Sequence, residues 1–237
     1  LELICEMRAQ IRCWFYALLF MSVALEDRTP YLKVKTYEEV RDEDGKEMHK
    51  STGNAIWFDD AVEKAGPDVL RWLYAASPPV NPLRFGFHVT QETARRLLSL
   101  WNTYEFYKTY ASIDQPEISQ EISPDEDFSR LDKWILSRLN RLIQSSRHSM
   151  DQQDTHSVVR EVEAFMEELS NWYIRRNRRR FWRAEMNANK QAAYSTLSHV
   201  IFQICKLCAP IIPFVTEAIY QDILRSDGWP ESIHLCY

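Results

Sequence analysis

Hydrophobic residues recur at helical spacing through most of the second half of the chain. Apolar positions three and four residues apart give a helix one face that a neighbour must cover. Short polar or proline-containing breaks separate these segments, so consecutive helices are expected to run antiparallel. The pattern predicts an antiparallel helical bundle with helices at residues 90–113, 127–150, 155–183, 189–209 and 213–225.

Two connections in this bundle have their own signals. Residues 114–127 are acidic and contain Ser and Pro, which predicts the one longer loop. Asp154 before Thr155 is typical of a helix N-cap, because its side chain can accept a hydrogen bond from a free backbone N–H of the first turn.

The first part of the chain has shorter elements of both kinds. Nearly continuous apolar residues predict a mostly buried helix, and alternation of apolar with polar residues predicts strands. The sequence Asp-Glu-Asp-Gly predicts a turn. These elements are a helix at 10–24, strands at 31–37 and 38–41, a turn at 42–45, and helices at 58–65 and 67–77.

A proline-rich stretch at residues 77–82 interrupts this pattern, because proline disfavours both helix interiors and central strands. We therefore place a domain boundary near residue 88, between residues 1–88 and 89–237. The expected fold is mainly α, with a small α/β part before the bundle.

Composition narrows the class of protein. With 45% hydrophobic and 27% charged residues, the chain has the composition of an ordinary globular protein. Its net charge is −5, so any contact with nucleic acid requires a local basic patch. The longest apolar run, residues 14–25, is too short for the roughly 20 residues of a membrane span. No charged segment with a small-residue cleavage site goes with it, so we do not expect it to be a signal peptide. Five sparse cysteines favour a reducing cytoplasm over a disulfide scaffold.

Residues 44–54 (Asp-Gly-Lys-Glu-Met-His-Lys-Ser-Thr-Gly-Asn) are the first candidate for chemistry. A turn, a lysine beside a hydroxyl and a Gly-Asn pair can bring an ammonium and backbone N–H groups onto phosphate oxygens. Taken alone, the same string is also typical of a solvated surface loop.

Residues 48–54 resemble the Lys-Met-Ser-Lys-Ser signature loop of class I aminoacyl-tRNA synthetases, including the Gly-Asn that follows it. Further similarity to the isoleucyl branch extends through nearly the whole chain in the family's order. It includes Trp-Phe-Tyr at 14–16, Gly-Pro-Asp-Val-Leu-Arg at 66–71, Pro-Pro-Val-Asn-Pro-Leu-Arg-Phe at 78–85, Leu-Ser-Asn-Trp-Tyr-Ile-Arg-Arg at 169–176 and Ala-Pro-Ile-Ile-Pro-Phe at 209–214.

The resemblance implies a division of labour between the two parts. Residues 1–88 would be the C-terminal part of a Rossmann-like catalytic domain, with the signature loop at 46–54, and residues 89–237 an anticodon-binding domain. The activity implied is ATP-dependent activation of an amino acid, isoleucine by the closest branch, and its transfer to tRNA, with Mg²⁺ expected in the full-length enzyme.

Within the loop, the resemblance assigns catalytic roles to Lys50 and Ser51. As an amino acid attacks the α-phosphate of ATP, negative charge builds on the departing pyrophosphate, and a positioned ammonium stabilises it. Ser51 would add a hydroxyl donor, and Gly53 would let the loop move. The expected ATP contacts are Met48, His49, Lys50, Ser51, Gly53 and Asn54.

The chain departs from the family pattern at several positions. Glu47 stands where the family has its first lysine, His49 replaces the first serine, and Lys46 lies one residue earlier as a possible substitute cation. Residues 6–13 lack the two Gly and the Asp of the corresponding family motif, and Tyr37-Glu38 replaces a usual His-Gly pair. No His-x-Gly-His string, the family's other phosphate motif, occurs. We expect the chain to be a fragment that is inactive alone.

Residues 172–183 (Trp-Tyr-Ile-Arg-Arg-Asn-Arg-Arg-Arg-Phe-Trp-Arg) are the second candidate, because they combine arginines with aromatics and contain no acid. Arginine forks suit phosphates and aromatic faces can stack on bases. The predicted tRNA contacts are Arg175, Arg176, Arg178, Arg179 and Arg180. In the alternative interpretation these arginines pair with Glu161, Glu167, Glu168 or Glu185. The four aromatics, Trp172, Tyr173, Phe181 and Trp182, are expected to be buried.

Other cysteine and histidine residues could suggest a metal or catalytic site, but they have simpler explanations. Cys205 and Cys208 lie in an apolar helical stretch without further ligands, so they are expected in the core and no metal site is predicted. His148 and His156 near a helix junction are expected to be structural, and His88 suggests no role.

Three functional alternatives stay open on the sequence. The chain could be a free-standing tRNA-binding module without ligase activity, a divergent paralogue of the isoleucyl enzymes, or a valyl or leucyl enzyme. The segment at 78–85 favours the isoleucyl branch over the last.

Overall fold

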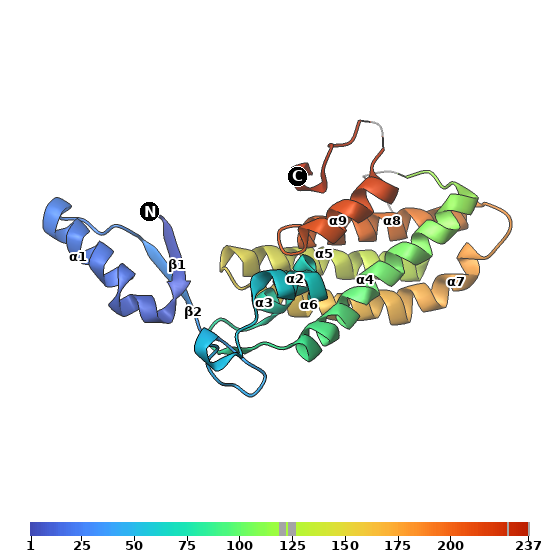
Figure 1. Cartoon of the computed structure of the whole chain (residues 1–237). Helices are drawn as coiled ribbons and strands as arrows, with labels where there is room; N and C mark the ends of the chain where they lie inside the picture. The colour runs from blue at the N-terminus through green and yellow to red at the C-terminus, as the bar shows by residue number, and fades with distance from the viewer. Residues whose placement is uncertain (119–121, 123–126, 227, 237) are drawn as a thin grey trace. The chain divides into compact units, whose positions relative to one another are not determined.

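The computed structural model describes residues 1–118, 122, 127–226 and 228–236, and helices dominate it (Figure 1). It contains two compact units. The first comprises residues 1–61 and 77–89, and the second comprises residues 62–76 and 90–237. The predicted fold class, mainly α with a small α/β part, is confirmed. Residues 62–76, which the sequence division assigned to the first part, group with the helical unit.

A parallel pair of strands begins the first unit. Strand β1 (Leu3–Met7) pairs with β2 (Lys33–Tyr37), and Leu3 lies opposite Lys33. Parallel neighbours need a crossover, which a 3₁₀ turn, η1 (Arg8–Arg12), and helix α1 (Trp14–Glu26) supply. The strand predicted at 31–37 is present as β2, which begins two residues later, at Lys33.

Helix α1 is much more exposed than the sequence pattern predicted. It begins at Trp14 rather than at residue 10, and Phe15 is its only buried residue. Phe20 is 62% exposed and Leu25 is 82% exposed. The prediction of a mostly buried helix is wrong for the described residues. An all-round apolar sequence indicates that a helix needs cover, but that cover must come from another element.

The loop that carries the signature residues lies in the chain between the two strands of a second parallel pair. Strand β3 (Val40–Arg41) pairs with β4 (Leu83–Arg84). The predicted turn at 42–45 is present, with Gly45 at φ +82° and its N–H donating to the Asp42 carbonyl oxygen over 2.9 Å. A 3₁₀ turn, η2 (Lys50–Thr52), and helix α2 (Phe58–Ala65) come next.

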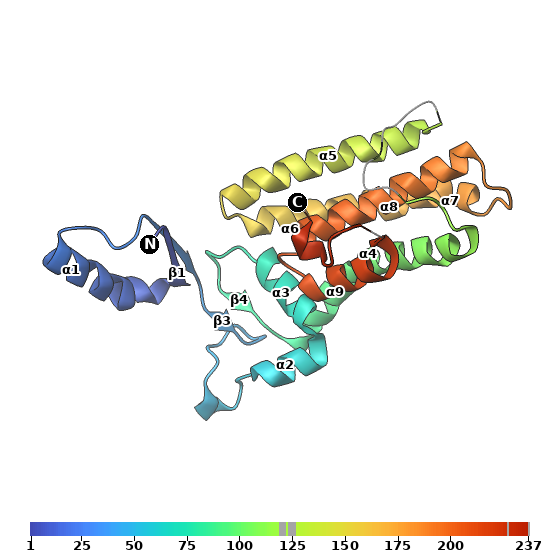
Figure 2. The ribbon, with the colours of Figure 1, turned by 90° about the horizontal axis from the view of Figure 1, so that it is seen from above.

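The second unit is the predicted antiparallel bundle (Figure 2). Helix α5 packs against both α6 and α8. Apart from a short 3₁₀ turn beyond residue 225, where no element was predicted, the remaining elements follow the predicted segments closely. They are α3 (Pro67–Ala76), α4 (Phe87–Asp114), α5 (Arg130–Asp151), α6 (Thr155–Glu167), the π-helix η3 (Glu168–Ile174), α7 (Arg175–Phe181), α8 (Ala188–Cys208), α9 (Pro213–Ile219), the π-helix η4 (Tyr220–Leu224) and the 3₁₀ turn η5 (Ile233–Leu235).

Local sequence signals set the helix starts. Ser129 and Asp132 form a reciprocal capping box at α5. Asp154 accepts a hydrogen bond from the Ser157 N–H at α6, which confirms the predicted N-cap, and Asn187 accepts one from the Lys190 N–H at α8. These caps satisfy N–H groups that the helices themselves leave without partners.

Large apolar side chains from α5, α6, η3 and α8 fill the core of this unit. Fully buried examples are Ile135, Leu139, Val159, Leu169, Leu197, Ile201 and Ile204. Cys205 and Cys208 are buried in the same core as predicted, and burial raises the pKa of Cys208 to about 12. None of the helices among the described residues is long and apolar enough to cross a membrane.

Candidate phosphate loop and arginine-rich helix

Asn54 holds the signature loop, residues 46–54, in one conformation. Its Oδ1 atom accepts hydrogen bonds from the His49 N–H (3.0 Å) and the Thr52 hydroxyl (2.6 Å). Its Nδ2 atom donates to Asp42 Oδ2 (2.7 Å) and to the Glu47 carbonyl oxygen (3.0 Å). One amide therefore connects the turn, the middle and the end of the loop. The sequence assigned Asn54 to ATP, whereas its hydrogen bonds here are internal.

Asp42 is the anchor of that arrangement. The Asn54 amide donates to one of its carboxylate oxygens, and the Lys46 N–H donates to the other over 2.7 Å. These hydrogen bonds lower the pKa of Asp42, because they favour the charged carboxylate. The turn before the signature loop is thus fixed by an ionised side chain.

Lys50 lies on the exposed turn η2, which ends at Gly53. Gly53 adopts φ +72°, a conformation that few other residues adopt readily, and a Cβ there would meet no atom within 4 Å. The Lys50 ammonium lies 4.7 Å from the ring centroid of Trp57. Ser51 is exposed beside it. Among the described residues, no carboxylate forms an ion pair with Lys50.

The two unusual residues of the loop form a pair with each other. His49 Nε2 lies 3.1 Å from Glu47 Oε2. Lys46, the proposed substitute cation, points its ammonium toward Asp44 at 3.5 Å. Both pairs are exposed. The acid at position 47 therefore has a partner within the loop, and the lysine at position 46 is directed to the turn.

The arginine-rich segment forms the end of the long helical run α6, η3 and α7. Tyr173 and Phe181 are buried, as predicted, and both lie on the stripe that faces the core. Trp172 and Trp182 are 47% and 57% exposed, so the prediction that they are buried is wrong. Adjacent helix positions differ by about 100° around the axis, so the neighbours of buried residues turn outward.

Four of the five candidate arginines are exposed. Among the residues that the structure describes, no ion pair holds Arg175, Arg176, Arg178 or Arg179. The Arg176 guanidinium stacks on the Trp172 ring at 3.8 Å from its centroid. The acids proposed as alternative partners are engaged elsewhere in two cases: Glu168 binds Arg138 at 2.8 Å, and Glu161 accepts from the Ser145 hydroxyl. An exposed arginine surface is the result.

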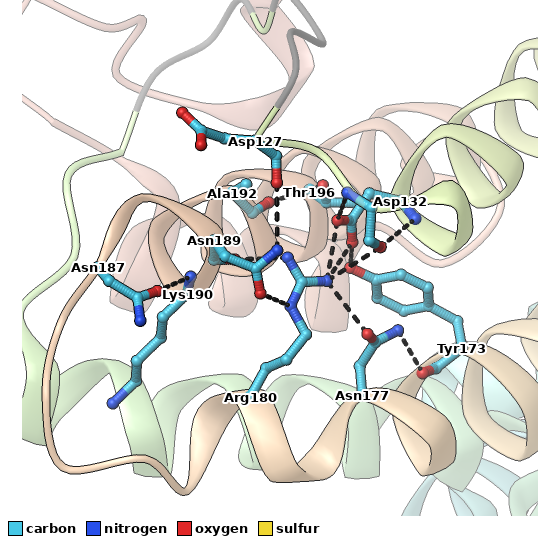
Figure 3. Close-up of polar contacts among 11 residues, drawn as sticks. Asp127, Asp132, Tyr173, Asn177, Arg180, Asn187, Asn189, Lys190, Ala192 and Thr196 are labelled. Atoms are coloured by element: carbon cyan, nitrogen blue, oxygen red, sulfur yellow. Dashed lines mark hydrogen bonds and ion pairs between the residues drawn. The ribbon is translucent and has the colours of Figure 1, made fainter.

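Arg180 is different, because its side chain points into the bundle (Figure 3). Its Nη1 atom donates to both carboxylate oxygens of Asp132 over 2.8 Å. Its Nε atom donates to Asn189 Oδ1 over 3.0 Å. The ion-pair interpretation holds for this arginine, but with Asp132 rather than with a glutamate. We therefore omit Arg180 from the arginines proposed to face tRNA.

Asp132 is the centre of this buried network, and the sequence analysis missed it. Its carboxylate is fully buried, caps α5 and accepts a hydrogen bond from the Tyr173 hydroxyl over 2.6 Å. Burial and then the charge of Asp132 raise the pKa of Tyr173 well above its ordinary value. The only sequence signal was the capping box, since Ser129 and Asp132 are three residues apart before an apolar run.

Comparison with known proteins identifies the family. Residues 1–86 match the family model described as tRNA synthetases class I (I, L, M and V), and residues 132–237 match the model described as anticodon-binding domain of tRNA ligase. The chain belongs to the class I tRNA synthetase family. Its described residues contain no cluster of three His, Cys, Asp or Glu side chains that could hold a metal ion.

Relatives among the class I synthetases match almost the entire chain. The isoleucine–tRNA ligase of Clostridium novyi is 42% identical over 99% of this chain, which spans 23% of that protein. Isoleucine–tRNA ligase 2 of Bacillus cereus is 40% identical over 99% of this chain, which spans 22% of it. The chain thus covers less than a quarter of the length of these relatives.

Solved structures of class I synthetases share the fold. The LeuRS of Agrobacterium radiobacter, in a ternary complex with tRNA and LeuAMS, superposes with a TM-score of 0.76 over 93% of this chain and 27% of its own, at 15% identity. The methionyl-tRNA synthetase of Mycobacterium tuberculosis, in complex with methionyl-adenylate, gives a TM-score of 0.75 over 92% of this chain and 43% of its own, at 17% identity.

Proposed function

We propose that this chain is the part of an isoleucine–tRNA ligase that supplies the mobile phosphate loop and the tRNA-binding helical bundle. The full-length protein would join isoleucine to ATP and then transfer it to tRNA, in the cytoplasm. The family match and the isoleucine–tRNA ligase relatives support this proposal. The observation that carries it is the exposed Lys50 ammonium, held on a glycine-ended turn at the signature position.

In the proposed reaction, an isoleucine carboxylate oxygen attacks the α-phosphorus of ATP. A new P–O bond forms, the bond to the bridging oxygen breaks, and pyrophosphate leaves with that electron pair. Lys50 would stabilise the charge that develops on the leaving group, and Ser51 would donate a hydrogen bond to it. Mg²⁺ would reach this site on the ATP phosphates, because Mg²⁺ is commonly held by substrate phosphates and few carboxylates.

The remaining loop residues have supporting roles in this proposal. The backbone N–H groups of Lys50 and Ser51 would face the phosphates, since those of His49, Thr52 and Gly53 donate to acceptors within the loop. Asn54 would keep the loop in shape. The Glu47–His49 pair reduces the repulsion that an isolated carboxylate would exert on a polyphosphate, because the imidazole lies 3.1 Å from it.

We propose that Arg175, Arg176, Arg178 and Arg179 contact tRNA phosphates. They are exposed and lie on one helical run of the unit that contains the anticodon-binding match. Guanidinium groups suit such contacts, because they donate two parallel hydrogen bonds to one phosphate.

Amino-acid-dependent exchange of label between pyrophosphate and ATP tests the assignment. The full-length protein is assayed with isoleucine, valine, leucine and methionine separately. We expect isoleucine to give the highest kcat/KM. A higher value with valine or leucine would assign the protein to that branch, and no exchange with any amino acid, together with retained tRNA binding, would favour a tRNA-binding module without ligase activity.

A further inference from the structure

Trp57 is an exposed aromatic residue with an unusual neighbour. It lies directly before α2, it is 56% exposed, and Lys50 places its ammonium 4.7 Å from the ring centroid. A cation within about 6 Å of an aromatic centroid is attracted by the negative face of the ring, and tryptophan is the strongest such partner. The side chain of Lys50, which the sequence assigns to phosphate, is therefore in contact with an aromatic ring rather than with solvent on all sides.

The loop is built so that these two side chains meet. Asn54 ties residues 47–52 to itself through His49, Thr52 and Glu47. Gly53 ends the η2 turn in a left-handed conformation. Because these contacts hold the loop on both sides of Lys50, the position of the lysine is set by the loop as well as by its own side chain.

A carboxylate of the same loop that could compete for the Lys50 ammonium already has another partner. Glu47 is three residues away and could draw the ammonium toward itself, but its carboxylate lies against His49. The ring of Trp57 covers one side of the ammonium and supplies no hydrogen-bond acceptor. The N–H donors on the other side stay available for phosphate oxygens.

We propose that Trp57 is a positioning residue that holds the Lys50 ammonium ready for the phosphates of ATP. This inference rests on the proposed role of Lys50. A lysine side chain loses much rotamer entropy when a ligand fixes it, and an aromatic ring that limits its conformations beforehand reduces that loss. Trp57 itself does not touch the reacting atoms.

Nuclear magnetic resonance of the ¹³C-lysine-labelled chain tests the contact directly. The Hε–Cε signal of Lys50 is assigned with Lys50→Arg, and sodium triphosphate serves as the phosphate probe. We expect the Lys50 Hε signal to be shifted upfield by the Trp57 ring current, and to return toward the value of a free lysine in Trp57→Leu, which keeps an apolar side chain but no ring.

Triphosphate affinity provides the functional readout. The Kd followed at the Lys50 signal should weaken about two- to five-fold in Trp57→Leu, which corresponds to roughly 0.5–1 kcal/mol, the strength of an exposed cation–π contact. Trp57→Tyr and Trp57→Phe should give intermediate Kd values, because their rings attract a cation less strongly than tryptophan does. A purely structural role of Trp57 would not make the Kd follow the cation–π strength of the ring. Phe58→Leu is the matched control, since Phe58 is an adjacent exposed aromatic at 76% exposure, and it should leave the Kd unchanged.

The outcomes separate this inference from the proposed function. A Lys50 signal that moves with triphosphate but has the same Kd in the wild type and in Trp57→Leu overturns the positioning role alone. A Lys50 signal at the free-lysine position in the wild type also overturns it. An upfield-shifted Lys50 signal that does not respond to triphosphate also overturns the positioning role, and isoleucine-dependent exchange by the full-length protein then tests the proposed function separately.

Discussion

Replacing Arg180 with methionine should destabilise the helical unit strongly. The Arg180 side chain is only 11% exposed, and its partner Asp132 is 0% exposed. Methionine preserves most of the length and apolar volume but removes the cation. Asp132 would keep the hydrogen bonds from Tyr173 and Ser129, yet its charge would be buried without a counter-ion.

The expected magnitude follows from that burial. Removing one partner of a buried ion pair costs about 3–5 kcal/mol, because an uncompensated charge remains inside. A helical unit of this size loses roughly 2–4 °C of Tm per kcal/mol. The Tm should therefore fall by about 6–20 °C in Arg180→Met.

Thermal unfolding followed by circular dichroism measures this change, with Arg178→Met as the matched control on the same helix. Arg178 is exposed and has no ion pair among the described residues, so its replacement should change the free energy of unfolding by less than about 0.5 kcal/mol. Adding Asp132→Asn to Arg180→Met should recover part of the loss, because the uncompensated charge disappears. Equal Tm values for Arg180→Met and Arg178→Met would refute the interior role of Arg180.

Three further outcomes follow from the same structure. In filter-binding titrations with isoleucine tRNA, Arg178→Gln with Arg179→Gln should reduce the salt dependence by about 0.7–0.9 in log–log slope per lost phosphate contact, and an unchanged slope would move the contact surface elsewhere. Trp172→Ala should lower the Tm by only a few degrees, because that ring is half exposed; a loss comparable to Arg180→Met would show that it packs in the core. Burial alone would raise the pKa of Asp114, but hydrogen bonds from Lys190 and Tyr194 hold it below its ordinary value. The stability that Asp114 contributes is therefore present above about pH 4 and is lost as the pH falls through the lowered pKa. In thermal unfolding at several acidic pH values, Asp114→Asn should lose less stability than the wild type as the pH falls, and an equal loss in the two proteins would contradict this.

The helices of the second unit were predictable because local signals mark them. Spacing gave the apolar faces, and Asp154 marked the start of α6. The π-helix η3 was not predictable, since its widened backbone keeps the same run of core residues as an ordinary helix. For helix α1, the sequence predicted the helix correctly but not its exposure. Its apolar sequence is clear, but burial depends on a partner that the helix sequence does not contain.

The candidate sites were predictable in composition and less so in orientation. The signature loop could be found from residues 48–54, whereas the contact between Lys50 and Trp57 depends on how Asn54 and Gly53 fold the loop. In the arginine-rich segment, Arg179 is exposed whereas the next residue, Arg180, points into the interior. Five of the six residues at 175–180 are arginines, so the sequence has no periodic pattern that shows which of them faces the interior. Arg180 faces the interior because Asp132 of another helix lies there to pair with it.

Lys50→Ala in the full-length protein tests the central claim most directly. Isoleucine-dependent pyrophosphate exchange should lose about 10²–10³-fold in kcat, the usual effect of removing one preorganised group that stabilises developing charge. Lys46→Ala, whose ammonium points toward Asp44, is the control and should retain most of the rate. The 237-residue chain alone should give no exchange, because no His-x-Gly-His string occurs in it. An unchanged kcat in Lys50→Ala would contradict the assignment of this loop to the ATP phosphates.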